Sequence, residues 1–307
     1  VAQNLTGALI GTLILWKATS WRPSFTYDHN EVKALFGFSA YQFFNKFVNT
    51  IINQLDVFII AKVFSPADLG FYSRAKGLRE RVKTYSTRSV ASIFFPVLSQ
   101  IKDDKKTFYR VFDKAFTVIM AFAFGLSGIM YVLGEEIIIG LYGEKWQPSV
   151  PIFQMLILIL FSYPISALIV NAFLSQGMAK QNFYIGLIRK FFQFIPLVVA
   201  FYSTIFNFTL ALVIVSYSML VFNIIMGYKF VNLNMKKLGR YFLISFWPLA
   251  ILIIFFETLQ IDKLYIKLIM SAMFILCIII SHYYFQSYAF EFIQENLIKL
   301  RKRIKKK

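Results

Sequence analysis

Nine long apolar stretches, separated by short polar connections, dominate this 307-residue chain. An α-helix needs about 20 apolar residues to cross the roughly 30 Å hydrocarbon core of a bilayer, and the stretches approach or exceed that length. They are continuous and lack the short alternating pattern of membrane β-strands. We therefore predict an all-α fold, a polytopic transmembrane helix bundle. The predicted helices cover residues 1–19, 34–63, 76–100, 108–141, 150–175, 181–204, 208–231, 241–260 and 264–290.

The composition agrees with a membrane location. Hydrophobic residues make up 58% of the chain and charged residues only 16%, values outside the range of ordinary soluble domains. The formal net charge of +18 does not indicate a nucleic-acid partner, because apolar stretches separate the basic residues. The single cysteine, Cys277, excludes an intrachain disulfide, and the HExxH, GxSxG and GxxxxGKS/T motifs are all missing. We therefore expect no enzyme, no metal site and no cofactor.

The positions of Lys and Arg predict the orientation, because cytoplasmic loops of membrane proteins are enriched in these residues. The carboxyl-terminal tail is strongly basic, so we expect a cytoplasmic carboxyl terminus and, with nine spans, an amino terminus outside. The loops then placed outside contain few basic residues, namely Lys145, Lys263 and Lys267. One connection contradicts the rule, because it is strongly basic although the count of spans from the cytoplasmic tail places it outside. Its cations are Lys62, Arg74, Lys76, Arg79, Arg81 and Lys83.

Polar side chains follow one face of the predicted helix at residues 34–63. They are Gln42, Asn45, Lys46, Asn49, Asn53 and Asp56. At about 100° per residue, all of them fall on one face about 100° wide. A helix surrounded by lipid would leave these groups without hydrogen-bond partners. We therefore predict that this helix lines a water-filled cavity or another polar helix.

Three arginines, Arg74, Arg81 and Arg88, are spaced by seven residues in the next segment. A helix aligns them in one stripe with a drift of about 20° per step, and Tyr85 and Ser92 join it. An arginine at the bilayer centre costs about 2.5–3.5 kcal/mol on insertion scales, so such a column indicates a functional site. The planar guanidinium donates two parallel hydrogen bonds to phosphate oxygens. The stripe therefore predicts a phosphate-binding cavity.

Two features of this region leave alternatives open. Four cations also fit at the membrane surface, where long side chains reach water. They are Arg74, Lys76, Arg79 and Lys83. Asp56 fits an ion pair with Arg74 or Arg81 as well as it fits a direct role in ion coupling.

Several short motifs stand in an order and spacing that resemble one family. They are Trp21-Arg22-Pro23, Leu55-Asp56, Leu69-Gly70-Phe71-Tyr72-Ser73-Arg74-Ala75, Phe95-Pro96-Val97-Leu98-Ser99-Gln100 and Gly143-Glu144-Lys145-Trp146. With them the chain resembles the polysaccharide-biosynthesis flippases, the Wzx-type branch of the MOP transporter superfamily. That superfamily also includes the MATE exporters and the lipid II flippase. The similarity runs over essentially the whole chain and is strongest from Trp21 to Trp146.

The resemblance implies a MATE-like architecture of two six-helix lobes around a central cavity. On that template, residues 1–33 hold the last helix of the first lobe and the inter-lobe linker, and residues 34–233 form the second lobe. Residues 234–291 add two carboxyl-terminal transmembrane helices, and residues 292–307 form a basic cytoplasmic tail. The chain would then lack most of the first lobe.

The resemblance also implies a function. Such proteins translocate an undecaprenyl-pyrophosphate-linked oligosaccharide, the repeat unit of O-antigen, capsule or exopolysaccharide, across the bacterial inner membrane by alternating access coupled to H⁺ or Na⁺. Expected partners are the lipid-linked oligosaccharide, the bilayer, and polysaccharide polymerase and chain-length proteins. Extrapolating from position, we expect substrate binding at Arg74, Arg81, Tyr85, Arg88, Gln42, Asn45, Asn49 and Asn53. Asp56 and Lys46 are candidates for ion coupling.

Two alternatives remain beside the flippase. A MATE-like drug or cation exporter would favour an acidic cavity, whereas this sequence offers Asp56 against several arginines. A membrane polysaccharide polymerase or ligase would carry a large outward loop, and the outward loops predicted here are short.

Overall fold

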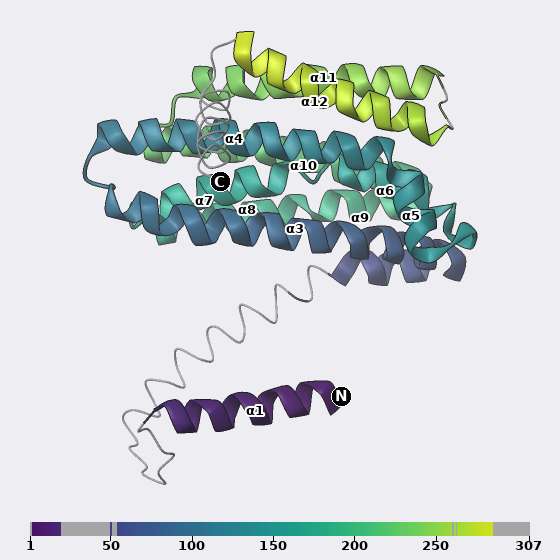
Figure 1. Ribbon diagram of the computed structural model, residues 1–307, viewed down its shortest axis with the longest axis horizontal. Coiled ribbons are helices and arrows are strands. Elements are labelled where there is room, and N and C mark those ends of the chain that lie inside the picture. The colour runs from purple at the N-terminus through teal and green to yellow at the C-terminus, as the bar shows by residue number, and fades with distance from the viewer. Residues whose placement is uncertain (1, 20–49, 51–53, 260, 262, 285–307) are drawn as a thin grey trace, which may run out of the picture. The chain divides into compact units, whose positions relative to one another are not determined.

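The computed structural model describes residues 2–19, 50, 54–259, 261 and 263–284 of the protein, and its described elements are helices (Figure 1). Six of the described helical stretches are long and apolar enough to cross a bilayer. They are Lys105–Val132, Ser149–Ser175, Ala179–Tyr202, Ile205–Val231, Met235–Leu259 and Leu264–Tyr284. The prediction of an all-α, polytopic membrane bundle is therefore confirmed.

The chain divides into two units, residues 1–53 and 54–307. The first unit contains α1 (Ala2–Ala18), an apolar helix of 17 residues. In the second unit residues 54–63 are helical and lead into α3. The remaining description concerns this second unit.

The helix α3 (Pro66–Gln100) is 35 residues long and begins earlier than the stretch predicted at residues 76–100. Its start is fixed by a capping box, because the Ser65 side chain accepts a hydrogen bond from the Asp68 backbone N–H and the Asp68 carboxylate accepts one from the Ser65 backbone N–H. Pro66 follows at the first helical position, where its missing N–H costs nothing. At 1.5 Å per residue, α3 is about 52 Å long, longer than the membrane is thick.

Three predicted spans are each divided into two helices. The stretch at 108–141 consists of α4 (Lys105–Val132) and α5 (Gly134–Tyr142), and the short η1 (Glu144–Trp146) follows. The stretch at 150–175 consists of α6 (Ser149–Ile157) and α7 (Ser162–Ser175). The stretch at 181–204 consists of α8 (Ala179–Phe192) and α9 (Phe194–Tyr202).

The last three helices are continuous. They are α10 (Ile205–Val231), α11 (Met235–Leu259) and α12 (Leu264–Tyr284). Asn232 ends α10 in the left-handed conformation, with φ of 55°. Gly is the commonest residue in this position of a helix, and Asn also occurs there. The pair α11 and α12 packs against α4 on the side away from α3 (Figure 1).

Aromatic rings fill the core between α4, α7 and the carboxyl-terminal pair. The rings of Phe124 and Phe161 stack with centroids 4.0 Å apart, and Phe242 and Phe246 pack edge-on against Phe124. Gly128 on α4 lets the ring of Phe274 on α12 approach the helix backbone closely. The second unit is therefore one packed bundle, with α3 along one edge and α11 and α12 along the other (Figure 1).

One end of this bundle collects several chain reversals. There lie α5, η1, the start of α6, the end of α11 and the start of α12 (Figure 1). We refer to it below as the α5 end.

Candidate functional site

The helix α3 carries polar residues on two opposite faces. The outer face holds the predicted stripe, Arg74, Arg81, Tyr85, Arg88 and Ser92, and all five side chains are exposed. The inner face holds Tyr72, Lys76, Arg79 and Lys83, which are buried or half-buried. At about 100° per residue the two sets lie about 180° apart around the helix.

The outer face lies at the depth of membrane-spanning helices. On its other side α3 packs along α6 and α7, which together form an apolar span of 27 residues. Tyr85 stands near the middle of α3, about 28 Å along the axis from Pro66 at 1.5 Å per residue. Yet α3 itself is not one of the described helices that are apolar enough to cross a membrane. A helix at membrane depth with a cationic face is unsuited to lipid contact, so this face requires water or a polar partner.

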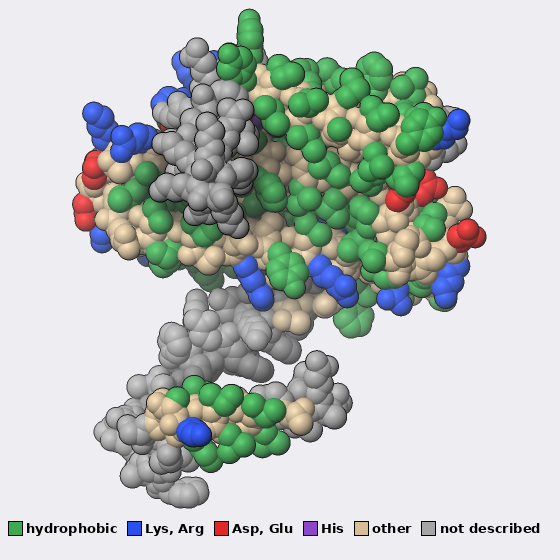
Figure 2. Space-filling view, viewed as in Figure 1, with side chains coloured by type: hydrophobic (Ala, Val, Ile, Leu, Met, Phe, Trp, Pro, Cys, Tyr) green, Lys and Arg blue, Asp and Glu red, His purple; other side chains and the backbone are tan. Residues whose placement is uncertain are grey.

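Arg81 and Arg88 are available to a ligand. Both side chains are exposed, and within the described ranges neither forms an ion pair. Figure 2 shows Lys and Arg side chains spaced along the edge of the second unit where α3 runs. The arrangement offers guanidinium donors to an anion in the surrounding space.

Arg74 is held differently from the other two arginines. Its guanidinium carbon lies 5.5 Å from the ring centroid of Tyr142 and 4.9 Å from that of Trp146, within the range of cation–π attraction. The Trp146 ring packs edge-on against Phe71, with centroids 6.0 Å apart. The stripe is thus fixed at the α5 end by an aromatic clamp.

Asp56, in the helix at residues 54–63, contacts the inner face of α3. Its Oδ1 atom lies 2.6 Å from the Lys76 Nζ atom, and Tyr72 donates a hydrogen bond of 2.6 Å from its hydroxyl to Oδ2. The predicted partner, Arg74 or Arg81, is therefore wrong, because both arginines lie on the opposite face of α3. The side chains of Lys76 and Asp56 are only 12% and 16% exposed, which makes this a largely buried ion pair.

Arg79 was not among the predicted site residues. It is only 6% exposed, so the interpretation that placed it at the membrane surface is wrong. Its Nη2 atom lies 2.5 Å from Glu80 Oε1, and its buried Nε atom has no hydrogen-bond partner among the described residues. Lys83 shares the same Glu80 carboxylate, at 3.0 Å, and its Nζ atom stands 4.5 Å from the ring centroid of Tyr163 on α7. A second periodic pattern, with spacings of four, three and four from Tyr72 to Lys83, is the signal that could have identified this face.

Five predicted residues lie outside the described residues, so their proposed roles stay predictions. They are Gln42, Asn45, Lys46, Asn49 and Asn53.

Comparison with known proteins finds matches concentrated in polysaccharide biosynthesis. Residues 1–151 match a family model described as "Polysaccharide biosynthesis protein". The chain is 27% identical over 57% of its length to the amylovoran biosynthesis protein AmsL of Erwinia amylovora, covering 45% of that protein. It is 22% identical over 58% of its length to the lipopolysaccharide biosynthesis protein WzxC of Escherichia coli, covering 36% of it. The chain thus matches less than half the length of these curated relatives.

A solved structure shares the fold. The lipid II flippase MurJ, in an inward closed conformation, aligns with 91% of this chain and 59% of its own chain at a TM-score of 0.63. The sequences are 16% identical in this alignment, so the likeness concerns the fold alone.

Proposed function

We propose that the chain is part of a Wzx-type polysaccharide-biosynthesis flippase and that the complete protein moves a lipid-linked oligosaccharide from one leaflet of the membrane to the other. The proposal draws on the names of the relatives, which concern amylovoran and lipopolysaccharide biosynthesis. It also draws on the fold shared with a lipid II flippase.

One observation carries the proposal: two exposed arginines without ion-pair partners in the described chain, Arg81 and Arg88, occupy the middle of a helix that lies among membrane spans. Each would cost about 2.5–3.5 kcal/mol on insertion scales at the centre of a lipid environment. A water-filled cavity removes this cost, and a pyrophosphate group turns the arginines into binding groups through bidentate hydrogen bonds. Tyr85 stands between the two arginines on the same face and adds a hydroxyl group and a ring.

The finer features of the proposal follow the family. The substrate would be undecaprenyl-pyrophosphate-linked, the membrane would be the bacterial inner membrane, and the carboxyl terminus would be cytoplasmic. Gln42, Asn45, Asn49 and Asn53 would bind sugar hydroxyls. Coupling to H⁺ or Na⁺ would involve Asp56 and Lys46, and polysaccharide polymerase and chain-length proteins would act on the same pathway.

The amount of surface polysaccharide on living cells tests the proposal directly. Arg81→Ala with Arg88→Ala, introduced into the native gene, is expected to abolish surface polysaccharide while the protein remains in the membrane. Lys106→Ala is the matched control, because Lys106 is an exposed cation outside the stripe, in the first turn of α4. Normal surface polysaccharide in the double variant would refute the proposed role of the stripe.

A further inference from the structure

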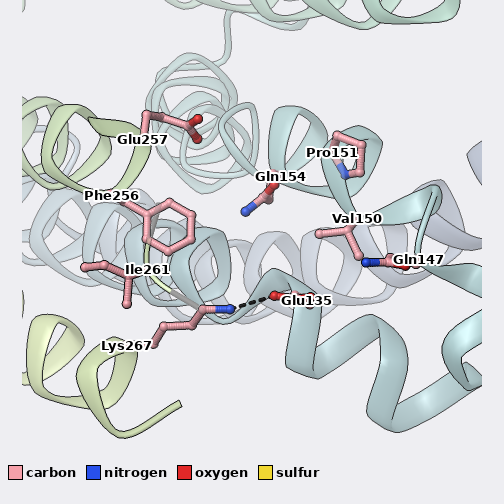
Figure 3. A pocket seen from close by; sticks show the side chains of 9 residues that line it. All are labelled: Glu135, Gln147, Val150, Pro151, Gln154, Phe256, Glu257, Ile261 and Lys267. Carbon is pink, nitrogen blue, oxygen red and sulfur yellow. Dashed lines mark hydrogen bonds and ion pairs between the residues drawn. The ribbon is translucent and has the colours of Figure 1, made fainter. Parts of the chain in front are cut away.

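A second polar site lies at the α5 end, and none of the outer-face residues of α3 lines it (Figure 3). Here a cavity of about 330 Å³ opens between α5, α6 and the pair α11 and α12. Its polar and aromatic walls include Glu135, Gln147, Gln154, Phe256, Glu257 and Lys267. The volume falls at the lower end of the roughly 300–1,000 Å³ typical of small-molecule sites.

One wall is held by a buried lysine. The Lys267 side chain is only 1% exposed, and its Nζ atom lies 2.7 Å from Glu135 Oε2 and 2.8 Å from Glu136 Oε1. A buried ammonium with two carboxylate partners fixes both carboxylates in place. Glu135 therefore lines the cavity with a carboxylate that is held in place by the Lys267 ammonium group (Figure 3).

The opposite wall is held by a buried tyrosine. The Tyr131 hydroxyl donates to Glu257 Oε1 at 2.7 Å, and the Tyr131 backbone carbonyl accepts from the Gln154 amide nitrogen at 3.0 Å. These two hydrogen bonds use one carboxylate oxygen of Glu257 and the amide nitrogen of Gln154. Within the described part of the chain, the second oxygen of Glu257, the side-chain oxygen of Gln154 and Oε1 of Glu135 have no hydrogen bond.

The charge of the lining decides which ligands fit. The lining holds two carboxylates, those of Glu135 and Glu257, and one ammonium group, that of Lys267, which Glu136 also contacts from outside the lining, so the site repels a phosphate. Fixed acceptor oxygens instead favour a ligand with several hydroxyl donors. The half-buried ring of Phe256 supplies an apolar face beside these acceptors (Figure 3). Acceptors around an aromatic face match the hydroxyl groups and the C–H face of a pyranose ring.

We propose that this cavity is a saccharide-binding site that accepts one or two neutral sugar residues. The inference rests on the proposed function for its role: the α5 end is the end that the Lys and Arg distribution places outside, where the sugar part of the cargo would emerge. The two sites would bind different parts of the same substrate because their charges differ. The basic outer face of α3 suits the pyrophosphate, and the acidic cavity suits the neutral sugars.

Saturation-transfer-difference NMR tests the site on the full chain in lipid nanodiscs. The probes are methyl β-D-glucopyranoside, methyl β-D-galactopyranoside and N-acetylglucosamine, with putrescine as a cationic competitor. Saturation transfer to at least one saccharide is expected, with at least a threefold loss in Glu257→Ala and in Gln154→Leu. Glu144→Ala is the matched control, because Glu144 is an exposed carboxylate at the same end outside the cavity lining, and its signal should be unchanged.

Three outcomes would overturn the inference. They are the absence of any saccharide signal from the folded chain, equal signals in Glu257→Ala and in the Glu144→Ala control, and complete displacement of the saccharides by micromolar putrescine, which would identify a cation site. The test is independent of transport. If Arg81→Ala with Arg88→Ala leaves surface polysaccharide normal while the saccharide signal is present, the proposed function fails and the binding site stands.

Discussion

The buried ion pair between Asp56 and Lys76 is predicted to contribute little net stability as a pair, whereas the loss of only one of its charges is predicted to destabilise the second unit. At their separation of 2.6 Å, and with an effective dielectric constant of about 20, the two charges attract each other by about 6 kcal/mol. Burying two charges costs a comparable amount, so the net contribution of the pair is small. Removing one partner, in contrast, leaves an uncompensated buried charge and is expected to cost about 3–5 kcal/mol.

The perturbation is a double-mutant cycle. Lys76→Met keeps the approximate volume and removes the ammonium group that faces the Asp56 carboxylate, and Asp56→Asn removes the negative charge that faces Lys76 while its side-chain oxygen can still accept from the Tyr72 hydroxyl. Each single variant is expected to lower the free energy of unfolding by about 3–5 kcal/mol. The combined variant is expected to lie within about 1 kcal/mol of the unmodified chain, because neither buried charge remains.

Unfolding in mixed micelles at increasing mole fraction of dodecyl sulfate, followed by tryptophan fluorescence, measures these free energies. A combined variant whose loss equals the sum of the two single losses would refute the reasoning, because the residues would then act independently. A loss below about 1 kcal/mol in Lys76→Met would also refute it, since the carboxylate would not be effectively buried.

Two further predictions concern contacts at α4 and at the aromatic clamp. Gly128→Ala places a methyl group against the buried Phe274 ring and is expected to cost about 1–3 kcal/mol in the same titration, whereas Gly140→Ala meets no atom within 4 Å and should be neutral or slightly stabilising. Trp146→Ala removes a cation–π contact of Arg74 and is expected to reduce surface polysaccharide, whereas Trp146→Phe keeps a ring and should retain more of it. Equal losses in the two Trp146 variants would contradict a clamp.

The fold class and the outer face of α3 could be predicted because both depend on local regularities. Helices follow from the length of apolar stretches, since a chain in lipid must satisfy its backbone hydrogen bonds internally. The stripe follows from the spacing of seven residues, and its five members share one exposed face. They are Arg74, Arg81, Tyr85, Arg88 and Ser92.

Two of the three breaks inside predicted spans stand just before a proline, because Pro164 and Pro196 lie in the first turns of α7 and α9. A proline there removes the N–H that would bond to the carbonyl four residues earlier, so the sequence marks these two places. The interruption between α6 and α7 consists of Leu158, Ile159, Leu160 and Phe161, residues that carry no turn signal. Three of them are buried, so packing in the bundle acts together with Pro164, which has no N–H to donate to the Leu160 carbonyl. The break at Leu133 could not be located from the sequence, because the sequence there predicts continuous helix until Gly134.

The ion pair between Asp56 and Lys76 could not be predicted for another reason. Both faces of α3 are polar, so periodicity separates the two faces but does not tell which one packs against the bundle. Tertiary contact decides this, because the helix at residues 54–63 brings Asp56 to Lys76 and α7 brings Tyr163 to Lys83. Burial of Arg79 follows from the same contacts.

Cysteine accessibility in the membrane tests most directly whether the outer face of α3 lines a water-filled cavity. In a Cys277→Ala background, which removes the single native thiol, Tyr85→Cys and Phe122→Cys form a matched pair, because the native side chains are 73% and 66% exposed. Tyr85→Cys is predicted to react rapidly with a charged, membrane-impermeant methanethiosulfonate and to be protected by lipid-linked oligosaccharide, whereas Phe122→Cys, on the apolar span α4, should resist the reagent. Resistance of Tyr85→Cys equal to that of Phe122→Cys would contradict the account.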